Sequence, residues 1–206
     1  MKTTGKRHEG RGKSGHRFGI ALLTLAAGAC ATLQQVAALR QVQFSIDRVS
    51  AVRLAGVDLA AKQSYRDLTL AEGAAFGAAV ARRELPLEFL LHVRGENPPD
   101  NRVSARLIRM EWTLLLEDRV TISGVLDREV LFPPGEPQDM PLTIRLNLVE
   151  FFSQNAPELF ALARNLTGQG GSPLQVRLRA LPTIQTALGP MRFPEPITIV
   201  SRTVGQ

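Results

Sequence analysis

The segment Leu87–Arg94, "LEFLLHVR", decides the fold class. Apolar side chains stand at every second position, namely Leu87, Phe89, Leu91 and Val93. Polar side chains stand between them, namely Glu88, His92 and Arg94. A period of two with one polar face is typical of a strand that buries one side and exposes the other to water. The segment therefore predicts a half-buried strand, with His92 as a solvated residue on its polar face.

Two later segments, Leu142–Leu148 and Leu174–Ala180, repeat this alternation. A third segment, residues 103–116, alternates as far as Leu107 and then changes phase at Ile108. One inserted residue produces such a phase change within a strand, so we expect a β-bulge near these two residues. Together these segments predict at least three more strands of the same half-buried kind.

Turn signals divide the strands. Glu117-Asp118 is expected to join two strands as a hairpin, and Leu188-Gly189-Pro190 to turn the last hairpin of the chain. Near the start, a long strand that begins at Val42 is expected to bend near Ser50. About seven strands with polar outer faces predict a mainly β protein, folded as a β-sandwich.

Two segments have helical character instead. Residues 71–83 are rich in alanine and predict a helix that ends before Pro86. A second helix is expected to start near Asn155, with a proline in its first turn, and to stop at Gly168. Its predicted apolar face consists of Phe152, Leu159, Ala163 and Leu166.

The charge of the chain is concentrated at its start. The net charge is +6, but six of the 25 Lys and Arg residues lie before residue 30, against one of the 19 Asp and Glu residues. The rest of the chain is nearly neutral. A nucleic-acid-binding domain carries its basic residues on the folded surface, so this class of function is not expected.

The basic start precedes an uncharged apolar run, Phe18–Ala29. Twelve residues are too few for a membrane-spanning helix, which needs about 20, but they fit the hydrophobic region of a secretory signal. One interpretation is ordinary cleavage after Ala27-Gly28-Ala29, which leaves Cys30 as an incidental thiol. The other is a bacterial lipobox, which Ala27-Gly28-Ala29-Cys30 resembles. In that case cleavage falls between Ala29 and Cys30, and Cys30 carries a diacylglyceryl group.

Chemistry favours the lipobox. Cys30 is the only cysteine of the chain, so it has no partner for an internal disulfide in an oxidising compartment. Two or three acyl chains would anchor it durably, because each buried methylene contributes about 0.8 kcal/mol. Ala31 follows the cysteine where an Asp would signal retention in the inner membrane. We therefore expect an exported protein, lipid-anchored in the cell envelope at the outer membrane and facing the periplasm.

Several features follow one another in a set order: Asn97-Pro98 after a strand, Trp112 in the next strand, Gly124 in the returning strand, and then Pro134-Gly135. This order resembles the motif pattern of the group 2 late embryogenesis abundant family, also called the WHy domain. The third position of the family's Asn-Pro-Asn motif holds Pro99 here. The resemblance covers mainly residues 87–148. It implies an immunoglobulin-like or fibronectin-III-like β-sandwich with one or two helices.

The resemblance also implies an organisation. Bacterial members are often small exported lipoproteins with no known enzymatic activity. The expected divisions of the chain are a lipoprotein signal peptide over residues 1–29, a lipid-anchored tether over 30–41, and the sandwich domain over 42–206. The motif residues are expected to have structural roles. The covalent lipid on Cys30 is the only non-protein group expected.

The sequence offers few candidates for catalytic residues. His92 is the only histidine after residue 30. Serines such as Ser50, Ser104 and Ser123 are not expected to have an acid–histidine partner. No cluster of Cys and His predicts a metal site, and Trp112 is expected in the core. We therefore expect no enzyme and no bound metal.

Two functions remain. The first is a non-enzymatic, membrane-anchored binding or stress-protective module of the bacterial envelope. The alternative is a carrier of lipid or another hydrophobic ligand, or an accessory subunit of an envelope complex. In the carrier, the helix within Phe151–Leu166 would cover an apolar groove lined by the Phe151-Phe152 pair and the alanine-rich segment around Phe76. The expected partners are the membrane and an envelope protein or lipid.

Overall fold

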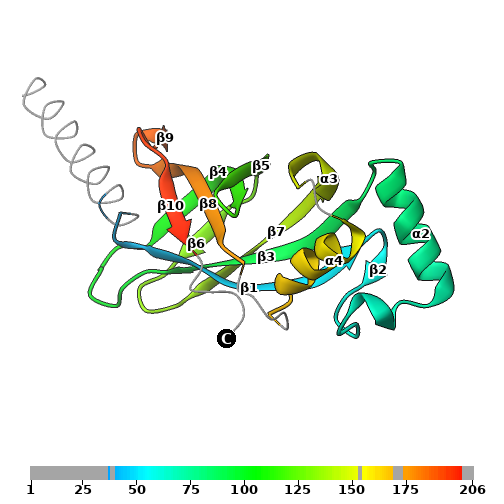
Figure 1. Cartoon of the computed structure of the whole chain (residues 1–206). Coiled ribbons are helices and arrows are strands. Elements are labelled where there is room, and N and C mark those ends of the chain that lie inside the picture. Colours follow the sequence, from blue (N-terminus) through cyan, green and yellow to red (C-terminus); the bar gives the residue numbers. More distant parts are fainter. Residues whose placement is uncertain (1–36, 38–39, 153–154, 169–173, 201–206) are drawn as a thin grey trace, which may run out of the picture.

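The computed structural model describes residues 37, 40–152, 155–168 and 174–200, which form two antiparallel sheets and several helices (Figure 1). The first sheet has four strands in the order β2-β1-β3-β7. Their bounds are Val57–Asp58 for β2, Gln43–Leu54 for β1, Pro86–Glu96 for β3 and Gln138–Asn147 for β7. Strand β3 is central and pairs with β7 over ten residues.

The second sheet has six strands. Its main path runs β10-β8-β4-β5, with bounds Ile197–Val200 for β10, Val176–Thr186 for β8, Ala105–Leu116 for β4 and Arg119–Leu126 for β5. Two short strands lie off this path: β6, Val130–Phe132, pairs with β4, and β9, Gly189–Arg192, pairs with β8. The predicted mainly β sandwich is confirmed, with ten described strands instead of about seven.

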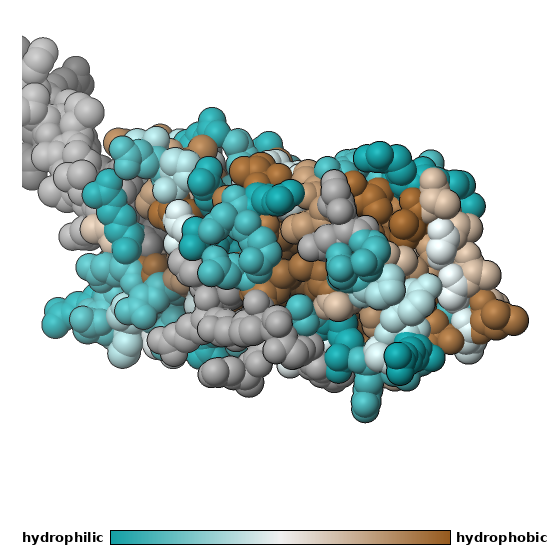
Figure 2. Space-filling view, viewed as in Figure 1, coloured by the Kyte–Doolittle hydropathy of each residue, from teal (hydrophilic) through white to brown (hydrophobic). Residues whose placement is uncertain are grey.

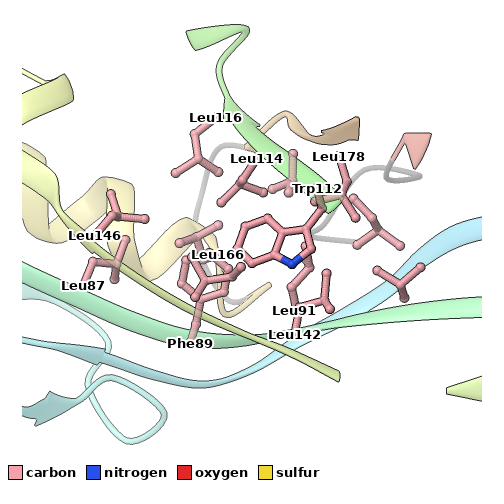
Figure 3. Close-up of a cluster of buried hydrophobic side chains, with 14 of the residues drawn as sticks. Leu87, Phe89, Leu91, Trp112, Leu114, Leu116, Leu142, Leu146, Leu166 and Leu178 are labelled. Atoms are coloured by element: carbon pink, nitrogen blue, oxygen red, sulfur yellow. The ribbon is translucent and has the colours of Figure 1, made fainter. Parts of the chain in front are cut away.

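The core lies between the two sheets. The long strands contribute the apolar side of their alternation, as the sequence predicts: Leu87, Phe89, Leu91 and Val93 of β3 are each at most 2% exposed. Trp112 and Leu114 of β4 and Leu178 of β8 face them from the second sheet (Figure 3). The predicted core position of Trp112 is confirmed, since its side chain is buried.

Helices gather toward one end of the molecule (Figure 1). The bounds are Leu70–Ala81 for α2, Leu148–Phe151 for α3 and Ala156–Asn165 for α4, preceded by a 3-10 turn, Tyr65–Asp67. Both predicted helices are confirmed. Asn155 caps α4 by accepting a hydrogen bond from the Glu158 amide, and a proline stands in its first turn.

Three irregularities shape the sheets. The predicted bulge in β4 is confirmed, because its register against β8 shifts between Leu107 and Arg109. The expected bend of β1 is a shift between Ser50 and Arg53, with Ala51 at a φ of 52°. The predicted turn Glu117-Asp118 has φ values of 49° and 61°, which match the twist of a two-residue hairpin.

One expectation about β3 is wrong. His92 does lie on the outer face, but it is only 8% exposed and is therefore not a solvated side chain. Its neighbours on β1 and β7 cover it and form hydrogen bonds with it, as described below. Alternation predicts the face on which a side chain lies, but neighbours on adjacent strands decide its exposure.

Candidate functional site

The motif residue Asn97 lies at the end of β3 and is fully buried. Its Nδ2 donates to the carbonyl oxygens of Val103, at 3.1 Å, and Phe132, at 2.8 Å. Its Oδ1 accepts from Nδ2 of Asn101 at 2.7 Å. Both ends of the amide are satisfied, so Asn97 ties the end of β3 to the following loop and to β6 without an energetic penalty for its burial.

Pro134 and Gly135 meet Asn97. Asn97 and Pro134 form an isolated parallel bridge, and the Gly135 amide donates to the Asn97 carbonyl at 2.8 Å. Gly135 has a φ of 74°, a conformation that favours glycine. We call Asn97, Asn101, Pro134 and Gly135 the Asn97 cluster. The cluster is a structural junction, because its polar groups bind one another.

The motif residues Trp112 and Gly124 stand opposite each other on β4 and β5. A Cβ added at Gly124 would lie 2.3 Å from Cζ2 of Trp112. The indole ring therefore lies directly over the glycine, and no larger residue fits there without a shift of the ring. The contact between Trp112 and Gly124 is therefore also structural.

A hollow of about 680 Å³ lies between α2 and the ends of β3 and β7. We call it the α2 groove. Its apolar lining is Ala55, Ala75, Ala79, Pro86 and Leu146. Its charged lining is Arg82, Glu84, Glu88 and Arg145. The charged residues pair across the rim, Arg145 with Glu88 at 3.5 Å and Arg82 with Glu84 at 4.0 Å, so the rim is electrically balanced.

Helix α2 extends this apolar surface into solvent. Its sequence, "LAEGAAFGAAVA", has one charged residue, Glu72, and only Phe76 and Ala79 are buried. Leu70 is 93% exposed, and a Cβ added at Gly77 would meet nothing within 4 Å. Figure 2 shows the pale and brown, weakly polar to apolar surface over this end of the molecule. A helix that is apolar on all sides is usually covered, so α2 presents an unsatisfied face.

The start of α2 is held firmly in spite of this exposure. The carboxylate of Glu72 accepts hydrogen bonds at 2.8 Å from Nζ of Lys62 and from the Thr69 amide. The Lys62 bond and the Thr69 amide lower the pKa of Glu72 from its ordinary 4.5 to about 2. In the preceding turn, backbone amides of Ser64 and Gln63 lower the pKa of Asp67. Two consecutive capping boxes thus position the helix.

The outer face of the first sheet holds a polar constellation that the sequence did not predict. Ser50 Oγ of β1 lies 2.9 Å from Nε2 of His92. Nδ1 of the same ring lies 2.8 Å from Oδ2 of Asp139 on β7. Arg48 adds a guanidinium 3.1 Å from Nδ1 and 3.5 Å from that carboxylate. The expectation that Ser50 would lack an acid–histidine partner is therefore wrong.

Strand register explains why the sequence pattern does not predict this constellation. His92 pairs directly with Arg48 on β1 and with Pro141 on β7, so Ser50 and Asp139 are its diagonal neighbours. The three residues are 42 and 47 positions apart in the chain. Only the bend expected near Ser50 pointed to this place. The prediction that the protein has no enzymatic activity remains untested.

Two of the residues expected to line a carrier groove are buried. The Phe76 ring lies 6.3 Å from that of Phe160 and 5.7 Å from that of Tyr65, in edge-to-face arrangements. Phe152 is buried, with the Arg119 guanidinium 5.6 Å from its ring centre. Phe76 and Phe152 therefore belong to the hydrophobic core. Phe160 was not predicted as part of this face.

Several other expectations concern metals and the membrane. Within the described ranges, no three Asp, Glu, His or Cys side chains come together as a set of metal ligands. None of the described helices has the length and apolarity that crossing a membrane would require. Ala29 and Cys30 lie outside the described residues, so the signal peptide and the lipidation site remain predictions.

Comparison with known proteins yields weak similarities. No protein-family model matches the chain, and no curated protein matches it. The solution structure of a protein described as late embryogenesis abundant (LEA) is similar at a TM-score of 0.38 and 10% identity, covering 98% of this chain and 97% of that one. A crystal structure from Archaeoglobus fulgidus is similar at a TM-score of 0.32 and 13% identity, covering 77% of this chain and 98% of that one. TM-scores this low carry no argument about function.

Proposed function

We propose that the protein is a lipid-anchored binding module of the bacterial cell envelope, and that the α2 groove holds a segment of a partner protein. The observation that carries this proposal is the apolar surface of α2 and its groove. The helix is positioned by two capping boxes, yet most of its apolar residues face solvent. A rigid apolar surface with a polar rim is the usual composition of a protein-binding site.

The rim of the groove favours a protein over a lipid as the occupant. Two arginines and two glutamates line it, so it offers no excess of positive charge to an anionic headgroup. A peptide segment carries both donors and acceptors and can pair with both signs. The shallow alanine floor, Ala75 and Ala79, admits apolar side chains without a deep pocket.

The position of the groove supports the same occupant. Strand β1 begins at Gln43 at one end of the molecule, and α2 lies at the opposite end (Figure 1). A lipid on Cys30, followed by the tether of residues 30–41, would hold the start of β1 close to the membrane. The α2 groove would then point away from that membrane, toward proteins of the periplasm.

The anchor is tested by replacing the cysteine. In Cys30→Ala we expect the protein to leave the membrane fraction and to lose labelling by a radioactive fatty acid. The matched control is Ser45→Ala, which should remain membrane-bound and labelled in the same cells. An unlabelled wild-type protein, or a variant that stays with the membrane, would overturn the lipoprotein proposal.

The groove is tested by photo-crosslinking in living cells. A benzoylphenylalanine at Glu84 should give one discrete cross-linked protein, and adding Ala75→Arg, at an exposed position of the groove, should abolish it. The same probe at Val125, an exposed position on β5, should give no such product. If the adduct at Glu84 is lipid by mass spectrometry, the protein is a hydrophobic-ligand carrier instead. If neither forms, the α2 groove is not a binding site.

A stress-protective role belongs to the same proposal and rests on the resemblance to the late embryogenesis abundant family. A strain without the protein should survive drying or osmotic shock less well than the wild type. Full-length protein should restore survival, and the Ala75→Arg variant should not. Equal survival of all strains would remove the protective role and leave the binding role standing.

A further inference from the structure

We propose that Ser50 is an activated nucleophile, and that Ser50, His92 and Asp139 form an acyl-transfer site for carboxylic esters on the outer face of the first sheet. This goes beyond the binding role, because it uses a different surface. The argument starts from the two hydrogen bonds of His92. Nε2 faces a hydroxyl at 2.9 Å, and Nδ1 faces a carboxylate at 2.8 Å.

These partners decide which nitrogen of His92 carries the proton. An ionised carboxylate only accepts, so Nδ1 must donate to Asp139. Nε2 is then free of hydrogen and accepts the Ser50 hydroxyl proton. The opposite tautomer would set an unprotonated Nδ1 against a carboxylate oxygen, two acceptors facing each other. The favoured tautomer is the one that a general base for a serine requires.

Arg48 competes with Asp139 for the same ring nitrogen. Its guanidinium lies 3.1 Å from Nδ1, and a hydrogen bond there would require an unprotonated Nδ1. The contact of Nδ1 with Asp139 is shorter, at 2.8 Å, and Arg48 has carboxylate partners in Asp139, at 3.5 Å, and in the neighbouring Asp47, so we assign the Nδ1 proton to the bond with Asp139. Arg48 therefore helps to hold Asp139 beside the ring as an anion. Arg48 and Asp139 are positioning residues in this proposal.

The backbone at Ser50 has the form of a nucleophile turn. Ser50 pairs with Leu90, and the next paired residue of β1 is Arg53, so two residues of β1 oppose one of β3. Ala51, directly after the serine, has a φ of 52°, which L-residues adopt only under constraint. We assign to the Ala51 amide the role of donor to the developing oxyanion, as the residue after the nucleophile does in serine hydrolases.

The surroundings indicate the class of substrate. Ser50 is half-buried. Leu90 stands opposite it on the same face and is also half-buried. An apolar side chain beside the nucleophile suits the short acyl group of a small ester.

Hydrolysis of an ester at this site needs no reagent other than water. Oγ of Ser50 attacks the ester carbonyl carbon and forms a C–O bond, while its proton passes to Nε2 of His92. The bond to the alcohol oxygen breaks, and His92 returns the proton to that oxygen. Water then attacks the acyl-serine by the same relay and restores the hydroxyl.

The test uses the full-length protein and a fluorophosphonate probe, which phosphonylates activated serines with loss of fluoride. We expect one adduct, mapped to Ser50 by peptide mass spectrometry. Mapping on the wild type needs no variant, so misfolding cannot obscure the result. No adduct, or an adduct on another serine, would overturn the proposal.

Variants then separate the roles. His92→Asn removes the base and should slow labelling by about 100-fold or more. Ser123→Ala is the control, because Ser123 lies exposed beside Thr113 without a histidine, and it should label at the wild-type rate. An unchanged rate in His92→Asn would refute the relay.

Asp139→Asn tests the positioning role through the tautomer of His92. An asparagine amide donating to Nδ1 would favour the wrong tautomer, so labelling should be slower by at least about tenfold. Nitrogen NMR of the His92 ring should show the proton on Nδ1 in the wild type and on Nε2 in the variant. A slower variant that keeps the wild-type tautomer would show that Asp139 is only structural.

Discussion

The two ends of the sandwich differ in how their polar and apolar groups are satisfied. At the Asn97 cluster both ends of the buried Asn97 amide have hydrogen-bond partners, and the Gly135 amide donates to the Asn97 carbonyl. At the α2 end, an apolar helix stands largely in water, with Leu70 93% exposed. The first arrangement stabilises the fold. The second leaves an apolar surface in water, and this is the surface that the proposed partner would cover.

The sharpest test of this contrast is Asn97→Ala. It removes three hydrogen bonds and leaves buried carbonyls and an amide without their partner, so we expect a loss of about 3 kcal/mol in the free energy of unfolding. Urea unfolding followed by circular dichroism measures it. Asn155→Ala, the same change at an exposed helix cap, should cost about 1 kcal/mol. Equal losses in the two variants would refute the structural role of the cluster.

Replacing glycine by alanine should change the free energy of unfolding in opposite directions at two positions. Gly124→Ala places a methyl group 2.3 Å from the Trp112 ring and should destabilise the fold by about 1–3 kcal/mol. Gly77→Ala in α2 meets nothing and should stabilise it by about 0.5–1 kcal/mol. Thermal unfolding of both variants beside the wild type gives the comparison. A destabilised Gly77→Ala would mean that the outer side of α2 is already covered in the isolated protein.

The contribution of Glu72, at the start of α2, to the stability of the fold should decrease in acid. Because the pKa of Glu72 is lowered from 4.5 to about 2, its carboxylate favours the folded state. That contribution is complete above pH 4.5 and is lost as the pH falls toward 2. Glu72→Gln lacks it at every pH. The difference in thermal midpoint between wild type and variant should therefore shrink between pH 4.5 and 2, and a constant difference would show that the charge is irrelevant.

The smallest effect on stability is expected at the most exposed apolar residue. Leu70→Lys should change the free energy of unfolding by less than about 0.5 kcal/mol, because the side chain is almost wholly in solvent. The same change at Leu91, which is fully buried, should prevent folding. Chemical denaturation of Leu70→Lys measures the first and expression in the folded state the second. A large loss in Leu70→Lys would mean that α2 is not an open surface.

The sequence predicted what depends on local pattern. Alternation located the inward faces of β3, β7 and β8, the phase change located the bulge at Leu107, and the paired acids located the Glu117-Asp118 turn. These features are determined by neighbours in the chain. Strand β9 belongs to the hairpin expected at Leu188-Gly189-Pro190. The short strands β2 and β6 were not distinguished from the longer segments beside them, because two or three residues are too few to show a period.

Features that depend on register were not predicted. Asn97 was expected to be structural, but its bonds to Val103, Phe132 and Asn101 join three separate segments. Ser50, His92 and Asp139 come from three strands, and a slip of one residue would turn each away from the others. Sequence periodicity indicates the side on which a residue lies. It does not indicate which residue of another strand lies beside it.

The length of β1 has a mechanical consequence. Its twelve residues extend about 40 Å, from Gln43 at one end of the molecule to the neighbourhood of α2 at the other. If the tether is held by a membrane and α2 by a partner, any pull between them acts along the strand. The nine register pairs that join β1 to β3 would then be sheared together instead of being opened one after another. Such an arrangement resists force, and it would let the module stay folded while the two attachments move relative to each other.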